Sequence, residues 1–327
     1  MRLDRILLST LAVIALVVMT TAARESRDDK PKAKPFVTGL GSGSGSTVGP
    51  DGALYVTVGL TGRVLRVNPR NGHVSTFASG LPPINSAVGI GGAMDVAFIG
   101  RTAYVLVTLV GSDTGGADTV GIYRIDSPTT STVIADIGAF AIANPPTTAF
   151  FVASGVQYAM QRYGRDFLVT DGHHNRVLRV TLDGEISELI TFGNIVPTGL
   201  ELAGPIVVMG QAGPVPHLPE NGKIVAFGPG SAGVATTLGS GAPLIVDVEF
   251  GPGLELYALS QGEFTPGNPE GSPANPNTGA LVVLRRDGTL GVVVSQLNQP
   301  TSLEFIGDTA FVVTLGGEIW KIDNVSR

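Results

Sequence analysis

The sequence predicts an all-β chain that folds as a six-bladed β-propeller with four-stranded blades. The 327 residues include 45 glycines and 22 prolines, and only 15% of residues are charged. This composition favours strands and tight turns over helices. One strand pattern also recurs six times, at a spacing of about 51 residues, which leaves room for four short strands in each copy. A four-stranded unit repeated at this period is typical of a propeller.

The chain begins with a segment typical of a secretory signal. Arg2 and Arg5 precede an apolar run of 14 residues, 6–19, and the small residues 21–23 form a cleavage site. A membrane anchor is the alternative, but spanning a bilayer needs about 20 apolar residues. We therefore expect a secreted or periplasmic protein without a membrane span after cleavage. The expected domains are a signal peptide over 1–23, a polar linker over 24–34 and the propeller over 35–327.

The third strand of each repeat is the easiest to recognise. The inner and second strands alternate apolar and polar residues or are rich in β-branched residues, and this period of two indicates strands rather than helices. The six third strands are expected at 62–67, 121–126, 175–180, 222–227, 279–284 and 317–322. Inner strands are expected near 96–100, 200–204, 248–251 and 303–307, and second strands near 53–57, 103–107, 166–170, 255–259 and 310–314.

The two ends of the chain are expected to meet in the last blade. Residues 35–40 resemble the outer strands at 74–81 and 292–297, while the sixth repeat ends near residue 325, after its third strand. An open ring would expose strand edges at its first and last blades. We therefore expect residues 35–40 to complete blade six. The alternatives are an open β-solenoid and two stacked sandwiches.

The connections between strands differ in length on the two faces of such a ring. Connections within the first and last hairpins of each blade are short and often contain Asp-Gly or Asn-Gly, so we call that side the short-turn face. The other side, the long-loop face, carries the loops 80–92, 109–120, 138–155, 211–221 and 260–278. Long loops on a rigid scaffold commonly carry binding sites, although neutral insertion is the alternative. We expect this face to bind a small molecule, a glycan or a protein.

Polar residues near the entry to each blade are the candidate ligand-binding residues. An Asn recurs in the loops that enter blades, and Asp or Gln begins several inner strands near the mouth of the channel. The candidates are Asp95, Asn144, Gln157, Asp171, Asn194, Asp247 and Asn298, and Asn85 shares the pattern. Ca²⁺ prefers such oxygen ligands, so Asp247, Asn194 and Asp95 are candidate ligands of a divalent cation. Asx-turns are the alternative use of these side chains.

Composition excludes several classes of function. The net charge of −6 gives no basic footprint for nucleic acid, and the absence of cysteine excludes disulfides and thiolate metal sites. The catalytic motifs of P-loop proteins, zinc proteases and serine hydrolases are absent from the sequence. No catalytic residue can therefore be assigned from the sequence. Separately, we expect the protein to be a monomer.

The four histidines offer little for metal binding. Residues 171–175 (Asp-Gly-His-His-Asn) contain two of them, and adjacent side chains of an extended segment point in opposite directions. We expect a hairpin loop there, with Asn175 or Gly172 at positive φ. His73 and His217 are expected at the surface, and the loop 260–278, with Phe264 as its only aromatic residue, is expected to be a flexible surface loop.

Several phrases of the sequence resemble the ScyD/ScyE family. These are Gly-Pro-Asp-Gly-Ala-Leu-Tyr-Val at 49–56, Thr-Asp-Gly-His-His-Asn-Arg-Val-Leu-Arg-Val at 170–180, Pro-Thr-Gly-Leu at 197–200 and Pro-Thr-Ser-Leu at 300–303. The resemblance covers about 35–325 and implies an exported six-bladed propeller. Most members of this family have no assigned reaction. Similar phrases occur in NHL-repeat proteins and in lactonases of the gluconolactonase/SMP-30 type.

The leading functional prediction is a non-catalytic binding scaffold. The alternative is a metal-dependent lactonase or hydrolase of the SMP-30/gluconolactonase type. Those enzymes place a metal-binding Glu just before the first inner strand, where this chain has only the glycines and serines of 41–46. A quinone-dependent sugar dehydrogenase is disfavoured, because four histidines and few aromatic residues offer little to hold such a cofactor.

Overall fold

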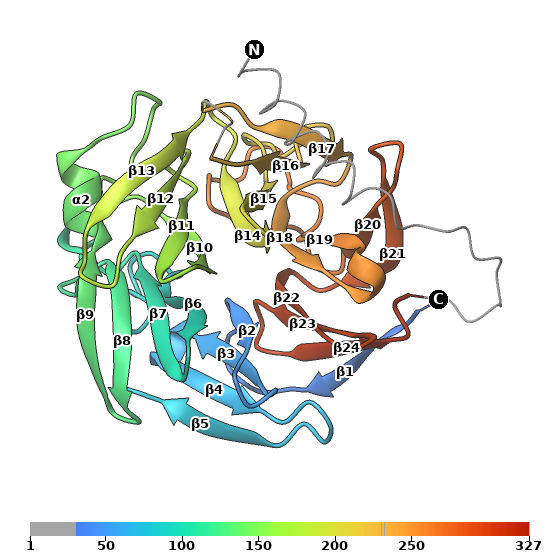
Figure 1. Ribbon diagram of the computed structural model, residues 1–327, viewed down its shortest axis with the longest axis horizontal. Coiled ribbons are helices and arrows are strands. Elements are labelled where there is room, and N and C mark those ends of the chain that lie inside the picture. The colour runs from blue at the N-terminus through green and yellow to red at the C-terminus, as the bar shows by residue number, and fades with distance from the viewer. Residues whose placement is uncertain (1–30, 230, 232, 327) are drawn as a thin grey trace, which may run out of the picture.

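The computed structural model describes residues 31–229, 231 and 233–326, and the predicted signal peptide lies outside this part of the chain. The described residues form six four-stranded antiparallel sheets arranged around a central axis (Figure 1). This confirms the predicted six-bladed propeller. None of the helices in the described part is long and apolar enough to span a membrane.

Blades one to three follow one another along the chain, each with its strands in order from the axis outward. Blade one contains β2 (Ser46–Val48), β3 (Leu54–Val58), β4 (Arg63–Val67) and β5 (Val74–Ala78). Blade two contains β6 (Gly92–Ile99), β7 (Thr102–Thr108), β8 (Gly121–Ser127) and β9 (Thr130–Asp136). Blade three contains β10 (Gln157–Tyr163), β11 (Asp166–Asp171), β12 (Arg176–Val180) and β13 (Ile186–Thr191).

Blades four and five repeat this order, and blade six differs in its outer strand. Blade four contains β14 (Pro197–Ala203), β15 (Ile206–Gln211), β16 (Lys223–Phe227) and β17 (Thr236–Ser240). Blade five contains β18 (Ile245–Phe250), β19 (Leu256–Ser260), β20 (Gly279–Leu284) and β21 (Leu290–Leu297). Blade six contains β22 (Pro300–Ile306), β23 (Thr309–Thr314), β24 (Ile319–Asp323) and β1 (Ala33–Val37).

The first strand of the chain closes the ring, as predicted. β1 pairs antiparallel with β24, with Ala33 opposite Ile322 and Pro35 opposite Trp320. Figure 1 shows β1 beside β24, close to the C-terminus. The strand begins two residues before the predicted position, inside the segment expected to be linker.

The hydrophobic core lies between neighbouring blades. The second strands are buried on both sides, because each lies near the middle of a blade that packs against two others. Tyr55 of blade one, for example, packs edge-on against Phe98 of blade two, with ring centroids 4.8 Å apart. Burial of these apolar faces makes the strands a rigid support for the connecting loops.

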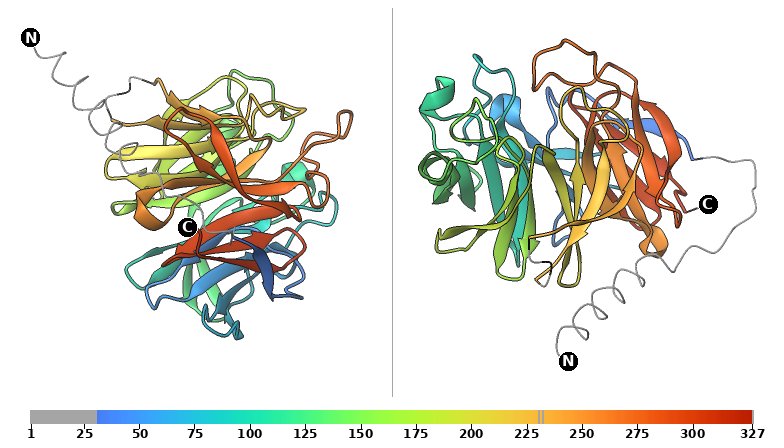
Figure 2. Two further views of the ribbon diagram at one scale, coloured as in Figure 1. Left: turned by 90° about the vertical axis from the view of Figure 1, so that its right-hand side faces the viewer. Right: turned by 90° about the horizontal axis from the view of Figure 1, so that it is seen from above.

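The long loops gather on one face, and one of them contains a helix. Figure 2 (right) shows the loop 260–278 and helix α2 on one side of the ring, and the short helix η3 (Pro252–Leu254) on the other. Helix α2 (Ile137–Ala143) lies at the start of the predicted loop 138–155. The Asp136 carboxylate caps it by accepting the N–H of Ala139, at 2.7 Å. Short helices η1 (Gly59–Thr61) and η2 (Ser112–Thr114) also lie on the long-loop face.

Candidate functional site

Asp95 and Asp247 connect neighbouring blades at the central channel. The Asp95 carboxylate on β6 accepts the N–H of Met160 on β10, at 2.7 Å. The Asp247 carboxylate on β18 accepts the N–H of Leu303 on β22, also at 2.7 Å. The second oxygen of each carboxylate accepts the N–H of the next residue on its own strand. Both residues therefore join the inner strand of one blade to that of the next.

A glycine in the preceding blade makes room for each of these carboxylates. A Cβ atom at Gly45 would overlap the Asp95 carboxylate, and one at Gly199 would overlap that of Asp247. The arrangement of glycine, aspartate and backbone N–H thus occurs twice, over blades one to three and again over blades four to six. Gly45 belongs to the Gly-Ser segment 41–46, so this segment allows a close approach between blades.

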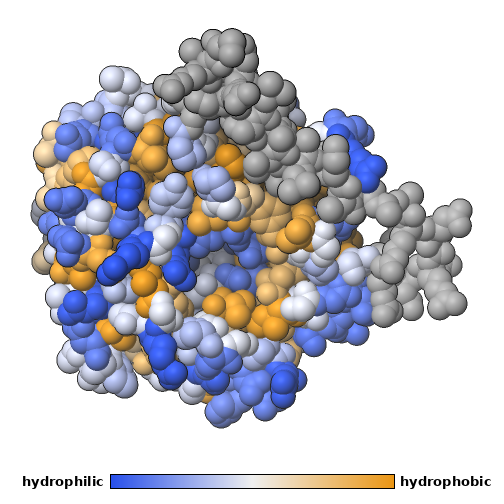
Figure 3. All heavy atoms as spheres, in the orientation of Figure 1, coloured by the Kyte–Doolittle hydropathy of each residue, from blue (hydrophilic) through white to orange (hydrophobic). Residues whose placement is uncertain are grey.

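Three glutamates line the channel beside these aspartates. Glu201, Glu249 and Glu304 occupy equivalent positions on β14, β18 and β22. None of these five acidic residues forms an ion pair with a Lys, Arg or His of the described chain. Figure 3 shows the hollow at the centre of the ring, with hydrophilic residues on part of its rim.

The pKa values of the channel carboxyl groups are raised. Burial raises the pKa of Asp95 to about 8 and that of Asp247 to about 7, against hydrogen bonds from backbone N–H groups that favour the charged form. Burial, together with neighbouring carboxylates, raises the pKa of Glu249 and of Glu304 well above the ordinary range. These groups therefore hold protons at pH values where exposed carboxyl groups are ionised.

The candidate cation ligands do not form a preformed metal site. Asp95 and Asp247 lie on blades two and five, and Asn194 is an exposed residue between β13 and β14. Across the described residues, no group of three or more His, Cys, Asp or Glu side chains is arranged to hold a metal ion. A divalent cation bound by these three residues stays a prediction, and their arrangement in the structure does not favour it.

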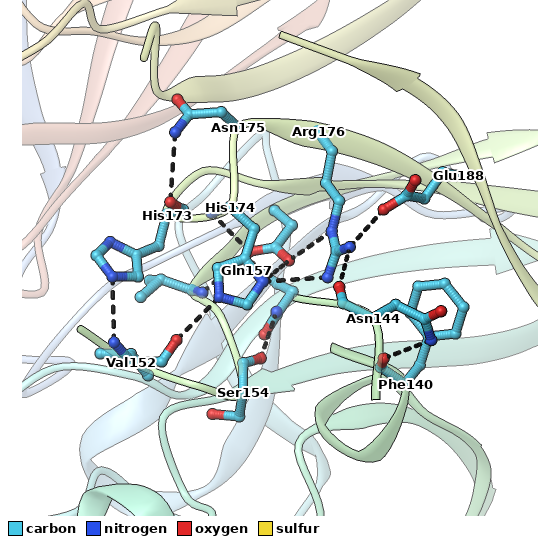
Figure 4. A network of polar contacts seen from close by, with 12 residues as sticks. Phe140, Asn144, Val152, Ser154, Gln157, His173, His174, Asn175, Arg176 and Glu188 are labelled. Atoms are coloured by element: carbon cyan, nitrogen blue, oxygen red, sulfur yellow. Dashed lines mark hydrogen bonds and ion pairs between the residues drawn. The ribbon is translucent and has the colours of Figure 1, made fainter. Parts of the chain in front are cut away.

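A buried polar network lies on the long-loop face of blade three (Figure 4). Arg176 is fully buried, and its Nε lies 3.2 Å from the Asp171 carboxylate. The same carboxylate lies 3.2 Å from Nδ1 of His174. Asp171 ends β11 and Arg176 begins β12, so the hairpin loop predicted at 171–175 brings these groups together. Asn175 adopts positive φ in this loop, at 55°, as the sequence analysis allowed.

This network fastens the loop 138–155 to blade three. The Arg176 guanidinium donates to the carbonyl oxygen of Asn144, at 2.7 Å, and also pairs with Glu188 on β13. His173 Nε2 accepts the N–H of Phe151 at 2.8 Å. An acceptor nitrogen must be unprotonated, and burial lowers the pKa of His173 accordingly.

Gln157 connects the same loop to blade two. Its side-chain N–H donates to the carbonyl oxygen of Ser154, at 3.0 Å, and its side-chain oxygen accepts from the Thr108 hydroxyl, at 2.8 Å. Gln157 and Asp171 are both fully buried. Of the candidate residues, Asn144, Gln157 and Asp171 therefore come together in one network.

Two asparagines of the entry loops, Asn144 and Asn85, have local structural roles. Asn144 ends α2, and its side-chain N–H donates to the carbonyl oxygen of Phe140, at 2.9 Å. The Asn85 side-chain oxygen accepts the N–H of Ala87 two residues later, which is the Asx-turn alternative. Asn298 Oδ1 is buried and has no hydrogen-bond partner among the described residues.

The loop 260–278 is folded onto its neighbour. Phe264 is only 7% exposed and packs edge-on against His217, with ring centroids 5.1 Å apart. Within the loop the Thr265 hydroxyl donates to the Asn275 side chain, at 2.8 Å. The predicted surface position of His217 is wrong, because Phe264 of the next blade covers its ring.

Exposed apolar side chains concentrate on the long-loop face. Twelve large apolar side chains are exposed in the described chain. Seven lie in the connections of this face: Leu60, Val88, Ile142, Phe150, Phe151, Val215 and Leu218. Only Val234 and Leu254 lie in turns of the opposite face, and the other three are on outer strands. Phe151 is 66% exposed and contacts the His173 ring, with centroids 4.1 Å apart.

Comparison with known proteins identifies the fold. No protein-family model and no curated protein matches the sequence. Solved structures do match, and the chain shares their fold. They are six-bladed propellers of the gluconolactonase and virginiamycin B lyase types.

Three of these structures illustrate the similarity. A gluconolactonase from Xanthomonas campestris is 12% identical with a TM-score of 0.61, over 90% of this chain and 89% of that one. Virginiamycin B lyase from Staphylococcus aureus is 14% identical with a TM-score of 0.53, over 90% of this chain and 99% of that one. The PQQ-bound aldose sugar dehydrogenase from Streptomyces coelicolor is 13% identical with a TM-score of 0.60, over 91% and 99%. Such low identity shows the fold alone, and membership of the ScyD/ScyE family stays a prediction.

Proposed function

We propose that this protein is an exported propeller of the ScyD/ScyE type that acts as a binding scaffold through its long-loop face. The observation that carries the proposal is the concentration of exposed apolar side chains on that face. Soluble proteins rarely expose a large apolar surface without a partner for it, and the opposite face has few such residues. Export rests on the signal-like residues 1–23.

The polar clusters near this face have structural roles, which favours binding over catalysis. Asp95 and Asp247 use both carboxylate oxygens to accept backbone N–H groups, one on their own strand and one on the inner strand of the next blade. Asp171 and Arg176 are fully buried and hold the loop that presents Phe150 and Phe151. A loop fixed in this way loses little conformational entropy when a ligand binds.

A thermal-shift screen tests the proposal. The purified protein is screened against soluble oligosaccharides, aromatic small molecules and synthetic peptides. A ligand at a hundredfold excess over its Kd stabilises the folded protein by about 2.7 kcal/mol. We expect the shift to be lost in the double variant Phe150→Ser/Phe151→Ser and kept in Val234→Ser/Leu254→Ser on the opposite face. Absence of any stabilising compound, or equal loss in both variants, would contradict binding at the long-loop face.

A metal-dependent lactonase is the second candidate. The gluconolactonase neighbour and the carboxylates of Asp95 and Asp247 in the channel favour it. Under the scaffold proposal, chelator and added Ca²⁺, Mg²⁺, Mn²⁺ or Zn²⁺ leave the melting temperature unchanged. A saturable increase with one of these ions that is lost in Asp247→Asn, together with lactone hydrolysis, would replace the scaffold with the enzyme.

A further inference from the structure

Three of the five long loops carry acidic residues, and none of the five carries Lys or Arg. These loops are 80–92, 109–120, 138–155, 211–221 and 260–278. The same loops contain five exposed acidic residues: Asp113, Asp118, Glu220, Glu263 and Glu270. None of the five forms an ion pair with a described residue. Two half-buried basic residues, Arg63 and Lys223, begin strands at the edge of this face, so acidic residues outnumber basic ones there.

The short-turn face has a different charge pattern. Arginines occur in its turns together with aspartates and glutamates, so charges of both signs are mixed there. The arginines of these turns are Arg70, Arg101, Arg165, Arg285 and Arg286. Two ion pairs lie at or beside these turns: Arg66 pairs with Asp51, which is in a turn, and Arg179 pairs with Asp166, the first residue of β11. The larger excess of negative charge thus lies on the long-loop face.

The acidic residues lie next to the exposed apolar ones. Glu220 shares the loop 211–221 with Val215 and Leu218. The Asp113 carboxylate accepts the N–H of Ser154, at 2.8 Å, and so lies beside the loop that carries Phe150 and Phe151. Acidic and apolar groups therefore form one mixed surface.

The loop 260–278 carries negative charge toward the inner strand β10. Tyr158 is the second residue of the inner strand β10 in blade three. Burial and the nearby carboxylates of Glu270 and Asp171 raise the pKa of Tyr158 to about 12. Glu270 belongs to a blade-five loop, so this loop extends its charge toward blade three.

We propose that the long-loop face docks a basic, amphipathic polypeptide segment. Its Lys or Arg side chains pair with the acidic residues, and its apolar side chains cover the exposed aromatic and aliphatic ones. The exposed residues of this face are spread over the connections of blades one to five, from Leu60 to Glu270, which favours a polypeptide over a small amine as the partner. This inference rests on the proposed binding function and names the partner for the same face.

Such a surface makes binding depend on salt. Uncompensated charge of one sign attracts a partner of the opposite sign and speeds its association. Salt screens exposed charges over about 10 Å at 0.1 M, so higher salt weakens the charge contribution and leaves the apolar contribution. Measuring both the affinity and its salt dependence therefore separates the contribution of the acidic residues from that of the apolar residues.

Three labelled synthetic peptides test the inference by fluorescence anisotropy with the purified protein. The first is an amphipathic peptide of Lys and Leu, the second replaces Lys with Glu, and the third keeps Lys but replaces Leu with Ser. The charge variant is Glu220→Gln/Glu263→Gln/Glu270→Gln, and the apolar variant is Phe150→Ser/Phe151→Ser. Exposed residues of the opposite face give the controls, Asp183→Asn/Glu185→Gln and Val234→Ser/Leu254→Ser.

The inference expects the Lys/Leu peptide to bind and the other two to bind weakly or not at all. Each test variant weakens binding about tenfold or more, which is about 1.4 kcal/mol, while the controls do not. Salt weakens binding to the native protein and affects the charge variant less. Failure of the Lys/Leu peptide to bind, or equal weakening in the controls, overturns the inference.

The outcomes also separate this inference from the proposed function. If the Glu/Leu peptide binds as tightly as the Lys/Leu peptide and both depend on Phe150 and Phe151, the basic partner is wrong and binding at this face stands. If no ligand or peptide depends on these two residues, both proposals fail. Binding of the Lys/Ser peptide alone would show simple charge attraction and would contradict an amphipathic partner.

Discussion

Two arginines on β12 show how position decides what an ion pair contributes. Arg176 and Arg179 are three residues apart, and each pairs with an aspartate on β11. The Arg176 side chain is 1% exposed, whereas that of Arg179 is 49% exposed. Three residues along a strand place side chains on opposite faces, so the two pairs have very different surroundings.

We expect Arg176→Met to lower the free energy of unfolding by about 3–5 kcal/mol, because it leaves the buried Asp171 without its positive partner. Arg179→Met should cost about 0–1 kcal/mol, since water already screens that pair. Unfolding in denaturant measures both. Equal losses of unfolding free energy in the two variants would show that burial does not increase the contribution of the Arg176 ion pair to stability.

The channel carboxyl groups predict a pH dependence of stability. Their pKa values are raised in the folded protein, so folding favours their protonated forms. This stabilisation is complete below the ordinary carboxyl pKa near 4 and is lost as pH rises through the folded values, about 7 for Asp247 and about 8 for Asp95. For these groups alone, stability falls from mildly acidic to mildly alkaline pH.

Glu249→Gln and Glu304→Gln test this, because glutamine resembles the protonated side chain at every pH. We expect each variant to melt at a higher temperature than the native protein at alkaline pH, with a smaller difference in mildly acidic solution. Glu185 is exposed, so Glu185→Gln is the control and should leave the melting temperature unchanged at both alkaline and mildly acidic pH. A difference in melting temperature that does not vary with pH would mean that these glutamates are not protonated in the folded ring.

At the scale of elements, local sequence patterns are sufficient to predict the positions of the strands. The third strands were expected within one or two residues of β4, β8, β12, β16, β20 and β24, because each repeats the same pattern. Helix α2 was missed. Its seven residues are too few for a helical period to be visible, and it depends on its cap at Asp136 and on packing against blade two.

The sites were predicted only in part for a related reason. Glu201, Glu249 and Glu304 each stand between two apolar residues of an inner strand. This pattern predicts strands, but it does not by itself show that the glutamates face the channel. For Arg176 and Arg179, alternation places the two side chains on opposite faces of the strand. It does not show which face is covered by the loop from the preceding blade, since that contact is tertiary.

Strand β1 gives a prediction for the closure of the ring. Removing residues 1–40 deletes β1 and leaves the edge of β24 unpaired, whereas removing residues 1–30 keeps it. An unpaired edge is prone to pair with another chain. We expect the shorter protein to melt at a lower temperature and to self-associate, as measured by calorimetry and light scattering. Two equally stable monomers would show that blade six is complete without β1.

At the scale of the whole molecule, the ring combines an internal repeat with two unlike faces. The inter-blade contacts of Asp95 recur at Asp247, three blades away, so the halves of the ring are held together in the same way. The loops depart from this repeat, because their acidic and apolar residues gather on one face. Under the proposed function, this surface of a uniform scaffold would distinguish its partner by charge.

The pairing of β1 with β24 also has a consequence for the time at which the protein becomes complete. β1 is synthesised before all the other strands of the ring and β24 after them, so blade six cannot form until the last strand of the ring has been made. At about 5–20 residues per second, translation of this chain takes roughly 15–65 s. Throughout that period the ring stays open, which is the state that the proposed export through a channel for unfolded polypeptide would need.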